Sequence, residues 1–298
     1  MEISAIVVKE LREKTGLGMM LCKKALMESK GDMTLAIEAL RKQGQSTAAK
    51  RAGKAAKQGK ITIVSDANAS IMYEVNSETD FVAKNDDFLG FIRILGTVLL
   101  EKKPADITAA KALASGAFSG LTPDAMILEL IAKIGEKISF RRYKKETVSS
   151  PNERLFTYTH GEGRIGVLVK LSCASAEAAA SAAVADLGKD LAMQVAASNP
   201  IAVDRDAINK QSSALVEKEK EIYLTQAQTS GKPEKVWPKI VEGKLAKFYK
   251  ESALFEQAYI RDPDRPVEDR IKDSEKAISS AITVVSFTRF ELGAEEQA

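Results

Sequence analysis

Residues 76–85 read Asn-Ser-Glu-Thr-Asp-Phe-Val-Ala-Lys-Asn, a short polar turn that contains a single aromatic side chain, Phe81. Residues 69–75 before it have the length and β-branched content of a half-buried strand. After it, large apolar side chains recur at steps of three and four residues, the period of an amphipathic helix: Phe88, Phe91, Ile92, Leu95 and Leu99. The stretch therefore predicts a strand, a tight turn and a helix.

Ordinary structural roles could account for the turn residues. Thr79 or Asp80 could cap the following helix by accepting hydrogen bonds from its free N–H groups. Phe81 could be a core residue that holds the turn down. The residue types alone leave these roles open beside a functional one.

The ten residues closely resemble the signature of bacterial elongation factor Ts, the nucleotide-exchange factor for the GTPase elongation factor Tu. The resemblance implies that Thr79, Asp80, Phe81 and Val82 bind elongation factor Tu. It also implies that they intrude near its magnesium and switch region, with Phe81 as an inserted wedge. Asp80 would compete electrostatically or fix the wedge by hydrogen bonds.

Length and composition bound the other possibilities. A chain of 298 residues exceeds a typical single domain, so two or three modules are expected. A net charge of +3 is too small to indicate nucleic-acid binding, and the two cysteines, Cys22 and Cys173, lack CxxC spacing. No apolar run reaches membrane-spanning length, and the first residues lack the pattern of a signal peptide. A cytoplasmic protein without a membrane contact is expected.

Residues 1–45 predict a small three-helix, UBA-like module. Ser4 is the expected N-cap of the first helix, which should end at Gly16, and Asp32 is the expected N-cap of the third. Because its core is so small, the module is expected to be stabilised by contacts with a partner or with the rest of the chain.

The same module resembles elongation factor Ts over residues 8–20 and 22–26. The resemblance implies that four residues dock the nucleotide-binding domain of elongation factor Tu: Arg12, Met19, Met20 and Lys23. Leu21 stands where the family usually carries Asp. The alternative is that Met19 and Met20 are core residues, as most methionines on helices are.

Residues 46–59 predict a basic linker or helix face. No acidic residue occurs between Glu38 and Asp66. Such a stretch could contact phosphates, but it has no aromatic side chains on which bases could stack. No direct nucleic-acid contact is expected.

Two similar α+β subdomains with antiparallel sheets are expected in the core. The first, 60–148, reads as two strands, helices and a third strand near 138–143. The second, 149–204 with 253–298, repeats the order with strands near 155–158 and 165–171 and one Ala-rich helix near 176–197. Residues 284–293 predict the strand that completes the second sheet.

Residues 205–252 predict an inserted helical hairpin or short coiled coil. Ile208, Leu215 and Ile222 fall seven residues apart, and Ser-Gly-Lys-Pro at 230–233 breaks the run before a second helix. That turn and Val-Glu-Gly-Lys at 241–244 resemble the inserted coiled-coil module of elongation factor Ts.

The glycines Gly161, Gly163 and Gly166 match a dinucleotide-binding fingerprint, but a β-type run follows where a helix is required. They predict a hairpin turn and no cofactor. His160 is the only histidine, so it cannot build a multi-histidine metal site, and no nucleophile-elbow motif accompanies it. By resemblance His160 lies at the interface with elongation factor Tu.

The resemblance runs from about residue 5 to residue 293 and adds contacts from Ile134, Gly135 and Ile260. It implies a nucleotide-exchange factor for elongation factor Tu that performs no covalent catalysis and needs no cofactor or metal. A homodimer or a two-to-two complex is a possible assembly. The rival classes are an RNA-binding accessory protein and a small-molecule enzyme.

Overall fold

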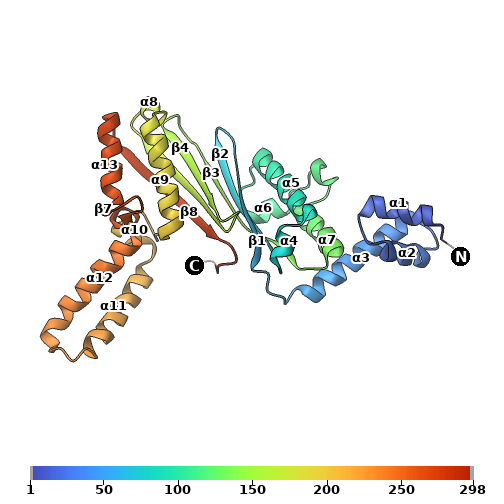
Figure 1. Cartoon of the computed structure of the whole chain (residues 1–298), viewed down its shortest axis with the longest axis horizontal. Helices are drawn as coiled ribbons and strands as arrows, with labels where there is room; N and C mark the ends of the chain where they lie inside the picture. Colours follow the sequence, from blue (N-terminus) through green and yellow to red (C-terminus); the bar gives the residue numbers. More distant parts are fainter. Residues whose placement is uncertain (1–2, 296–298) are drawn as a thin grey trace. The chain divides into compact units, whose positions relative to one another are not determined.

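The computed structural model describes residues 3–295 and has an α+β fold with small antiparallel sheets (Figure 1). The chain forms two compact units. The first holds the residues up to Lys145, Gly161–Ile165 and the residues from Phe290 on; the second holds Glu146–His160 and Gly166–Arg289. In the described part of the chain no helix is long and apolar enough to cross a membrane.

The first unit begins with three helices: α1 (Ala5–Thr15), α2 (Met19–Glu28) and α3 (Met33–Arg51). The predicted caps are confirmed. Ser4 Oγ accepts a hydrogen bond from Val7 N at 3.4 Å, and Asp32 Oδ1 accepts one from Leu35 N at 2.9 Å. Gly16 ends α1 with a left-handed φ of 67°.

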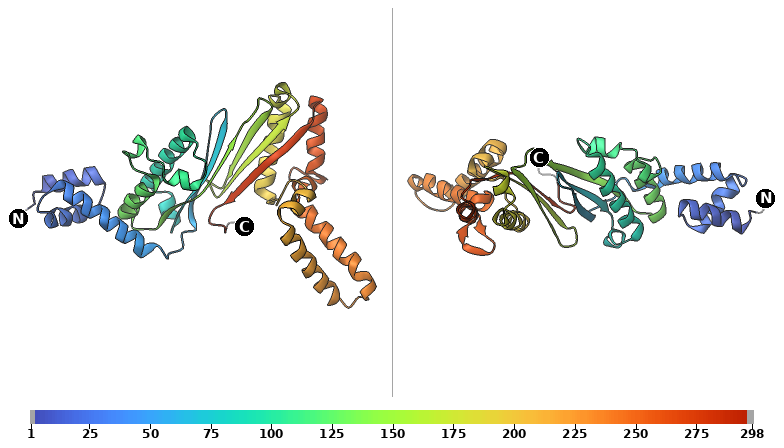
Figure 2. Two further views of the ribbon diagram at one scale, coloured as in Figure 1. Left: turned by 180° about the vertical axis from the view of Figure 1, so that it is seen from behind. Right: turned by 90° about the horizontal axis from the view of Figure 1, so that it is seen from above.

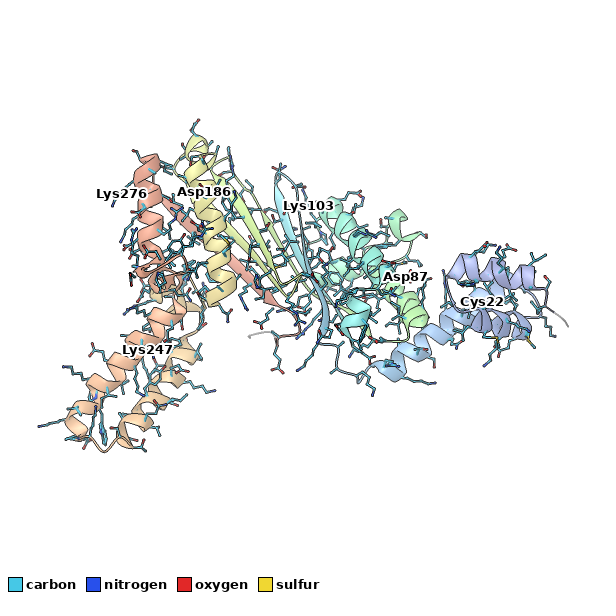
Figure 3. All side chains as sticks on the ribbon, viewed as in Figure 1. Cys22, Asp87, Lys103, Asp186, Lys247 and Lys276 are labelled. Carbon is cyan, nitrogen blue, oxygen red and sulfur yellow. The ribbon has the colours of Figure 1, made fainter. Side chains whose placement is uncertain are left out.

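A small core joins these helices and includes Leu11, Leu26 and the free thiol Cys22, which lies within the helical module (Figure 3). Cys173, in the other unit, is also a buried free thiol. Helix α3 continues to Arg51, into the stretch from which a basic linker was expected, so part of that basic run is helical.

The sheet of the first unit has the order β1-β2-β3. Strand β1 (Gln58–Ser65) pairs antiparallel with β2 (Ala69–Ser77), from Gln58↔Ser77 to Ser65↔Ser70, and β3 (Ile138–Thr147) lies on the other side of β2. The helical segments of this part are α4 (Asp80–Ala83), α5 (Asp86–Lys102), α6 (Ile107–Lys111), η1 (Gly116–Phe118) and α7 (Pro123–Ile134).

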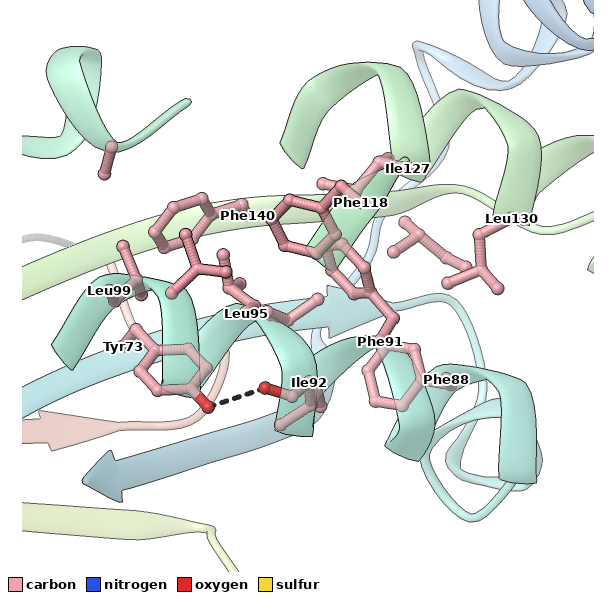
Figure 4. Packing of buried hydrophobic residues seen from close by; sticks show 14 of the residues in the cluster. Tyr73, Phe88, Phe91, Ile92, Leu95, Leu99, Phe118, Ile127, Leu130 and Phe140 are labelled. Carbon is pink, nitrogen blue, oxygen red and sulfur yellow. Dashed lines mark hydrogen bonds between the residues drawn. The ribbon is translucent and has the colours of Figure 1, made fainter. Parts of the chain in front are cut away.

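Helix α5 covers this sheet and α7 packs against α5, and their apolar side chains join a dense aromatic and aliphatic core (Figure 4). Tyr73 on β2 donates a hydrogen bond from Oη to the carbonyl of Ile92 on α5 at 2.8 Å, and burial raises the pKa of Tyr73. A Cβ at Gly96 would lie 2.5 Å from Tyr73 Oη, so a residue without a side chain is needed there. The amphipathic helix predicted after the turn is therefore confirmed as α5, with its apolar face on β2.

Two distant segments complete the first unit. The carbonyl of Gly163 accepts a hydrogen bond from Ile61 N at 2.8 Å, and Leu292 N donates to the carbonyl of Arg164 at 2.8 Å. Glu74, fully buried on β2, accepts a hydrogen bond from Gly293 N at 2.9 Å. A backbone hydrogen bond and one buried carboxylate therefore hold Gly163 and Gly293 against the first sheet.

The sheet of the second unit has the order β4-β5-β8, with β4 (Glu153–His160), β5 (Ile165–Cys173) and β8 (Ile282–Glu291). The last strand thus completes this sheet, as expected. Helix α9 (Ala182–Ser198) packs along β4 (Figure 1). One Ala-rich helix was expected, but α8 (Ala176–Ala179) precedes α9 as a separate turn because Ser181 starts a new helix by capping Val184 N at 3.3 Å.

Residues 258–278 contain elements that the sequence did not predict. Strands β6 (Ala258–Tyr259) and β7 (Asp262–Pro266) form a small antiparallel ribbon, and α13 (Val267–Ile278) follows before β8. For this part of the chain the sequence predicted only the last strand, near residues 284–293. Helix α13 packs against α9 and buries Val267, Ile271 and Ser274.

The predicted hairpin is present as α10 (Arg205–Gln211), α11 (Ser213–Gln228), η2 (Glu234–Val236) and α12 (Trp237–Ser252), followed by η3 (Leu254–Glu256). Helices α11 and α12 lie side by side (Figure 2). The heptad spacing does not form a buried seam, since Leu215 and Ile222 are 37% and 38% exposed. Ser212 interrupts the helix with φ −135° and ψ 38°, so Ile208 and Leu215 do not share one continuous helical phase.

A charged pair inside the second unit predicts sensitivity to acid. Glu153 accepts hydrogen bonds from Lys170 Nζ at 2.9 Å and from Ser149 N at 2.6 Å, and Lys170 holds the pKa of the Glu153 carboxyl below its ordinary value. Because the folded pKa lies below the unfolded one, the stabilisation is present above the ordinary glutamate pKa of about 4.3. It is lost as the pH falls through the folded pKa.

Glu153→Gln should therefore lower the free energy of unfolding by about 1–3 kcal/mol near neutral pH, because a charge-assisted bond is lost. The deficit should shrink below about pH 4. Urea unfolding followed by circular dichroism at several pH values measures this. Glu217→Gln, which removes the exposed pair with Lys220, is the control and should change little. A Glu153→Gln deficit that stayed constant down to low pH would contradict the assignment.

Candidate functional site

The most exposed large apolar side chain of the described residues is Phe81, at 81% exposure on the short helix α4. The reading of Phe81 as a core residue is therefore excluded. An aromatic side chain that stays in water contributes no burial free energy to the isolated fold, whereas aromatic side chains buried in protein interfaces contribute strongly to binding. Its exposure makes Phe81 a candidate anchor for a protein interface.

The turn that carries Phe81 is held from both sides. Thr79 is the N-cap of α4, since its Oγ1 accepts a hydrogen bond from Val82 N at 3.4 Å. Ser77 Oγ donates to the carbonyl of Thr79 at 2.8 Å. Val82 is only 7% exposed and packs into the core beneath α4, so its side chain supports the turn from inside.

A carboxylate from a distant segment clamps the same turn. Glu136 accepts hydrogen bonds from Thr79 N at 3.0 Å and from Thr79 Oγ1 at 2.8 Å, across 57 residues of sequence. Glu136 reaches this point because Gly135 ends α7 in the left-handed conformation, with φ 82°, and its N–H donates to the carbonyl of Ile131. The fold therefore brings Ile134 and Gly135 next to Thr79–Val82.

A second carboxylate ties the turn to the end of α3. Glu78 makes a two-pronged ion pair with Arg51 Nη1, at 2.9 and 3.1 Å, and accepts a hydrogen bond from Lys137 N at 2.6 Å. Lys137 Nζ in turn donates to the carbonyls of Ala52 and Lys54 at 2.6 and 3.0 Å. The contacts of Glu78 and Lys137 together fix the position of the turn from which Phe81 projects.

Sequence reasoning assigned no role to Glu78, Arg51, Glu136 or Lys137. Glu78 lies within the signature, so its position was visible, but its partners were not. The pairing of residue 79 with residue 136 leaves no local pattern, because nothing in the neighbourhood of either residue specifies the other.

Asp80 occupies the first turn of α4, beside Phe81, and makes an exposed ion pair with Lys84 at 3.7 Å. An exposed pair of this kind contributes little free energy. Its carboxylate therefore remains available to a cation or a hydrogen-bond donor outside this chain.

The N-terminal helices present further apolar side chains. Met19 and Met20 on α2 are 54% and 77% exposed, which excludes the core reading, and Arg12 and Lys23 are exposed as well. Methionine side chains adapt to irregular surfaces, so an exposed pair suits a docking face. Three other apolar residues of this module are exposed as well: Ile6, Met27 and Leu35.

Two predicted site residues lie in the second unit. His160 is exposed at the end of β4, where its Nδ1 lies 3.1 Å from Tyr158 Oη. Ile260 is exposed between β6 and β7, and its N–H donates to Gln194 Oε1, a fully buried group on α9, at 2.9 Å. His160 and Ile260 therefore lie on separate elements of the second unit, β4 and the turn between β6 and β7.

The glycines after His160 form the predicted hairpin turn between β4 and β5, with left-handed φ values at Gly161 and Gly163. A strand follows them, which confirms that this is not a dinucleotide-binding loop. Within residues 3–295 no group of three His, Cys, Asp or Glu side chains is placed to hold a metal ion.

Comparison with known proteins gives a consistent result over almost the whole chain. The family described as "Elongation factor TS" matches residues 78–294. Elongation factor Ts of Clostridium perfringens is 41% identical over 293 residues, covering 98% of this chain and 93% of the relative. That of Syntrophotalea carbinolica is 43% identical (98% and 94%), and that of Chloroherpeton thalassium is 41% identical (98% and 99%).

The clamp on the turn can be tested without a partner. Glu136→Ala should leave the Thr79 N–H and hydroxyl without their acceptor and loosen residues 76–85, with a loss of about 1–3 kcal/mol in the free energy of unfolding. Hydrogen–deuterium exchange of peptides covering these residues should become faster. Glu38→Ala, on the exposed surface of α3, should leave that exchange unchanged. Equal protection in both variants would show that Glu136 does not hold the turn.

Proposed function

Because this chain belongs to the elongation factor Ts family, we propose that it is a guanine nucleotide exchange factor that binds elongation factor Tu in its GDP form and promotes GDP release. The proposal places the protein in the cytoplasm, where translation elongation takes place. The factor would act by binding alone, without covalent catalysis, a cofactor or a metal of its own.

The observation that carries the proposal is the exposure of Phe81 on a turn held by Glu78 and Glu136. An exchange factor must bind the GTPase most tightly in a form that holds nucleotide poorly. By linkage, bound nucleotide then weakens binding of the factor by the same ratio. A side chain that displaces part of the GTPase must resist being displaced itself, and the two carboxylate contacts supply that resistance.

In the proposed mechanism Phe81 enters elongation factor Tu near its Mg²⁺ and phosphate site. The aromatic ring inserts a large area at a small cost in side-chain entropy. Asp80, beside it, brings a negative charge to a region that holds a cation and phosphates, which disfavours the nucleotide-bound form. Thr79 and Val82 keep the wedge in place, and Ile134 and Gly135 add contacts at its flank.

Other surfaces would provide binding energy that does not depend on the nucleotide. Arg12, Met19, Met20 and Lys23 dock the nucleotide-binding domain of elongation factor Tu, and His160 and Ile260 add contacts from the second unit. Because the docking residues and the residues around Phe81 have separate tasks, their variants should fail differently. Docking variants should lose affinity for elongation factor Tu, and variants of the wedge should lose exchange rate.

Stopped-flow release of a fluorescent GDP from cognate elongation factor Tu tests the function. The chain should accelerate release catalytically. Phe81→Ala should reduce the accelerated rate by about 10- to 100-fold, the range for loss of a buried aromatic anchor, and weaken binding to nucleotide-free elongation factor Tu by less.

The control for this experiment is Ile94→Ala, which removes another exposed apolar side chain of the same unit, on α5. It should keep the wild-type rate. Wild-type exchange by Phe81→Ala would refute the wedge, and no acceleration by the folded wild-type chain would refute the exchange function itself.

A further inference from the structure

The strand β4 ends in a row of three rings on one face: Phe156, Tyr158 and His160. Side chains two residues apart on a strand point to the same side, so the row follows from the spacing. Exposure increases along it, from the partly buried Phe156 and Tyr158 to the exposed His160. The row therefore leads from a partly buried position to the surface of the second unit.

Phe156 anchors the inner end of the row. A Cβ at Gly188 on α9 would lie 2.3 Å from the ring of Phe156, so the ring lies directly against the helix backbone. No side chain could be added at Gly188 without displacing the ring. This contact fixes the strand against α9 four residues before His160.

Tyr158 makes two contacts with His160. The ring centroids are 6.1 Å apart with an interplanar angle of 27°, a stacked arrangement. Tyr158 Oη lies 3.1 Å from His160 Nδ1, within hydrogen-bonding distance. Within residues 3–295 His160 makes no other side-chain hydrogen bond. Its Nε2 is therefore unengaged within the described chain.

The chemistry of the two rings favours one direction for this bond. A neutral imidazole has one nitrogen that donates and one that accepts. A phenol hydroxyl is a good donor, and the unprotonated imidazole nitrogen is a strong acceptor. With Tyr158 donating to Nδ1, the proton of the imidazole resides on Nε2, which then donates outward. A hydrogen bond at one ring nitrogen thus sets what the other can do.

We propose that Tyr158 is a positioning residue that holds the His160 imidazole in the Nε2–H form, aimed at a hydrogen-bond acceptor on the GTPase. The acceptor would be a backbone carbonyl or a carboxylate of elongation factor Tu. This inference rests on the proposed function, in which His160 contacts elongation factor Tu. The Tyr158 hydroxyl itself does not touch the partner; it acts through the imidazole.

The single histidine makes the ring state directly measurable. In the untagged chain a long-range ¹⁵N–¹H correlation spectrum contains one imidazole. The sample is held at about pH 8.5 for this measurement. The wild-type spectrum should show the Nε2–H pattern, with the Nδ1 resonance displaced in the direction of a hydrogen-bonded acceptor.

Tyr158→Phe keeps a ring to stack on His160 and removes only the hydroxyl. The Nδ1 resonance should move to the position of an unbonded imidazole nitrogen, and the accelerated GDP release should slow by about five-fold, the effect of one ordinary hydrogen bond. Thr157→Val removes a hydroxyl from the opposite face of the same strand and should change neither measurement.

The two readouts separate the possible failures. A wild-type spectrum with the proton on Nδ1, or an Nδ1 resonance unchanged in Tyr158→Phe, would overturn the assignment of the bond. The expected spectra with a wild-type release rate for Tyr158→Phe would overturn the positioning role. A folded wild-type chain that does not accelerate GDP release would refute the proposed function, whatever the spectra show.

Discussion

The first unit depends on a carboxylate that has no access to water. Glu74 on β2 is fully buried, and its partners are Arg142 on β3, Asn76 Nδ2 at 2.8 Å and Gly293 N at 2.9 Å. A buried charge is tolerated only when it is paired and hydrogen-bonded, and removing one partner is costly. Arg142 also donates to the carbonyl of Glu291 at 2.7 Å and lies over the ring of Phe290. The pair therefore ties residues 290–293 to the first sheet.

This constraint has a consequence at the other end of the strand. Every residue of β2 is buried up to Ser77, so the strand cannot shift its register without exposing its core face or burying unpaired polar groups. The turn that follows starts from a fixed point, and Glu78 and Glu136 then direct it. Two sets of contacts therefore keep Phe81 exposed: the buried ion pair on β2 fixes the strand, and Glu78 and Glu136 hold the turn that follows it. A flexible turn would let the ring fold back onto apolar surface.

Local signals were the reliable part of the sequence. Ser4 and Asp32 begin their helices and Gly16 ends one, as expected. A helix cap is a contact between residues three or four positions apart, so it can be recognised in the sequence. The heptad of Ile208, Leu215 and Ile222 does not mark the packed face of the hairpin, because Ser212 separates Ile208 from the other two and α11 buries Val216 and Ala227 instead. Helix α13 was not predicted, although Val267 and Ile271 stand four residues apart on one face of an otherwise polar segment, the spacing of an amphipathic helix. The Ala-rich helix is divided at Ser181 because the Ser181 side chain accepts a hydrogen bond from Val184 N and so begins a new helix.

The sequence by itself determined the caps, the two similar strand-turn-strand-helix orders, the last strand and the signature around Phe81, but not β6, β7 or α13. Only the tertiary structure decided whether Phe81, Met19 and Met20 face the core or the solvent, because burial depends on what packs against a residue. It also decided which groups hold the turn: Thr79 meets Glu136 across 57 residues, and Glu78 meets Arg51 across 27. Short-range geometry is encoded by neighbouring residues, whereas a contact between distant segments exists only after the chain has closed around its core.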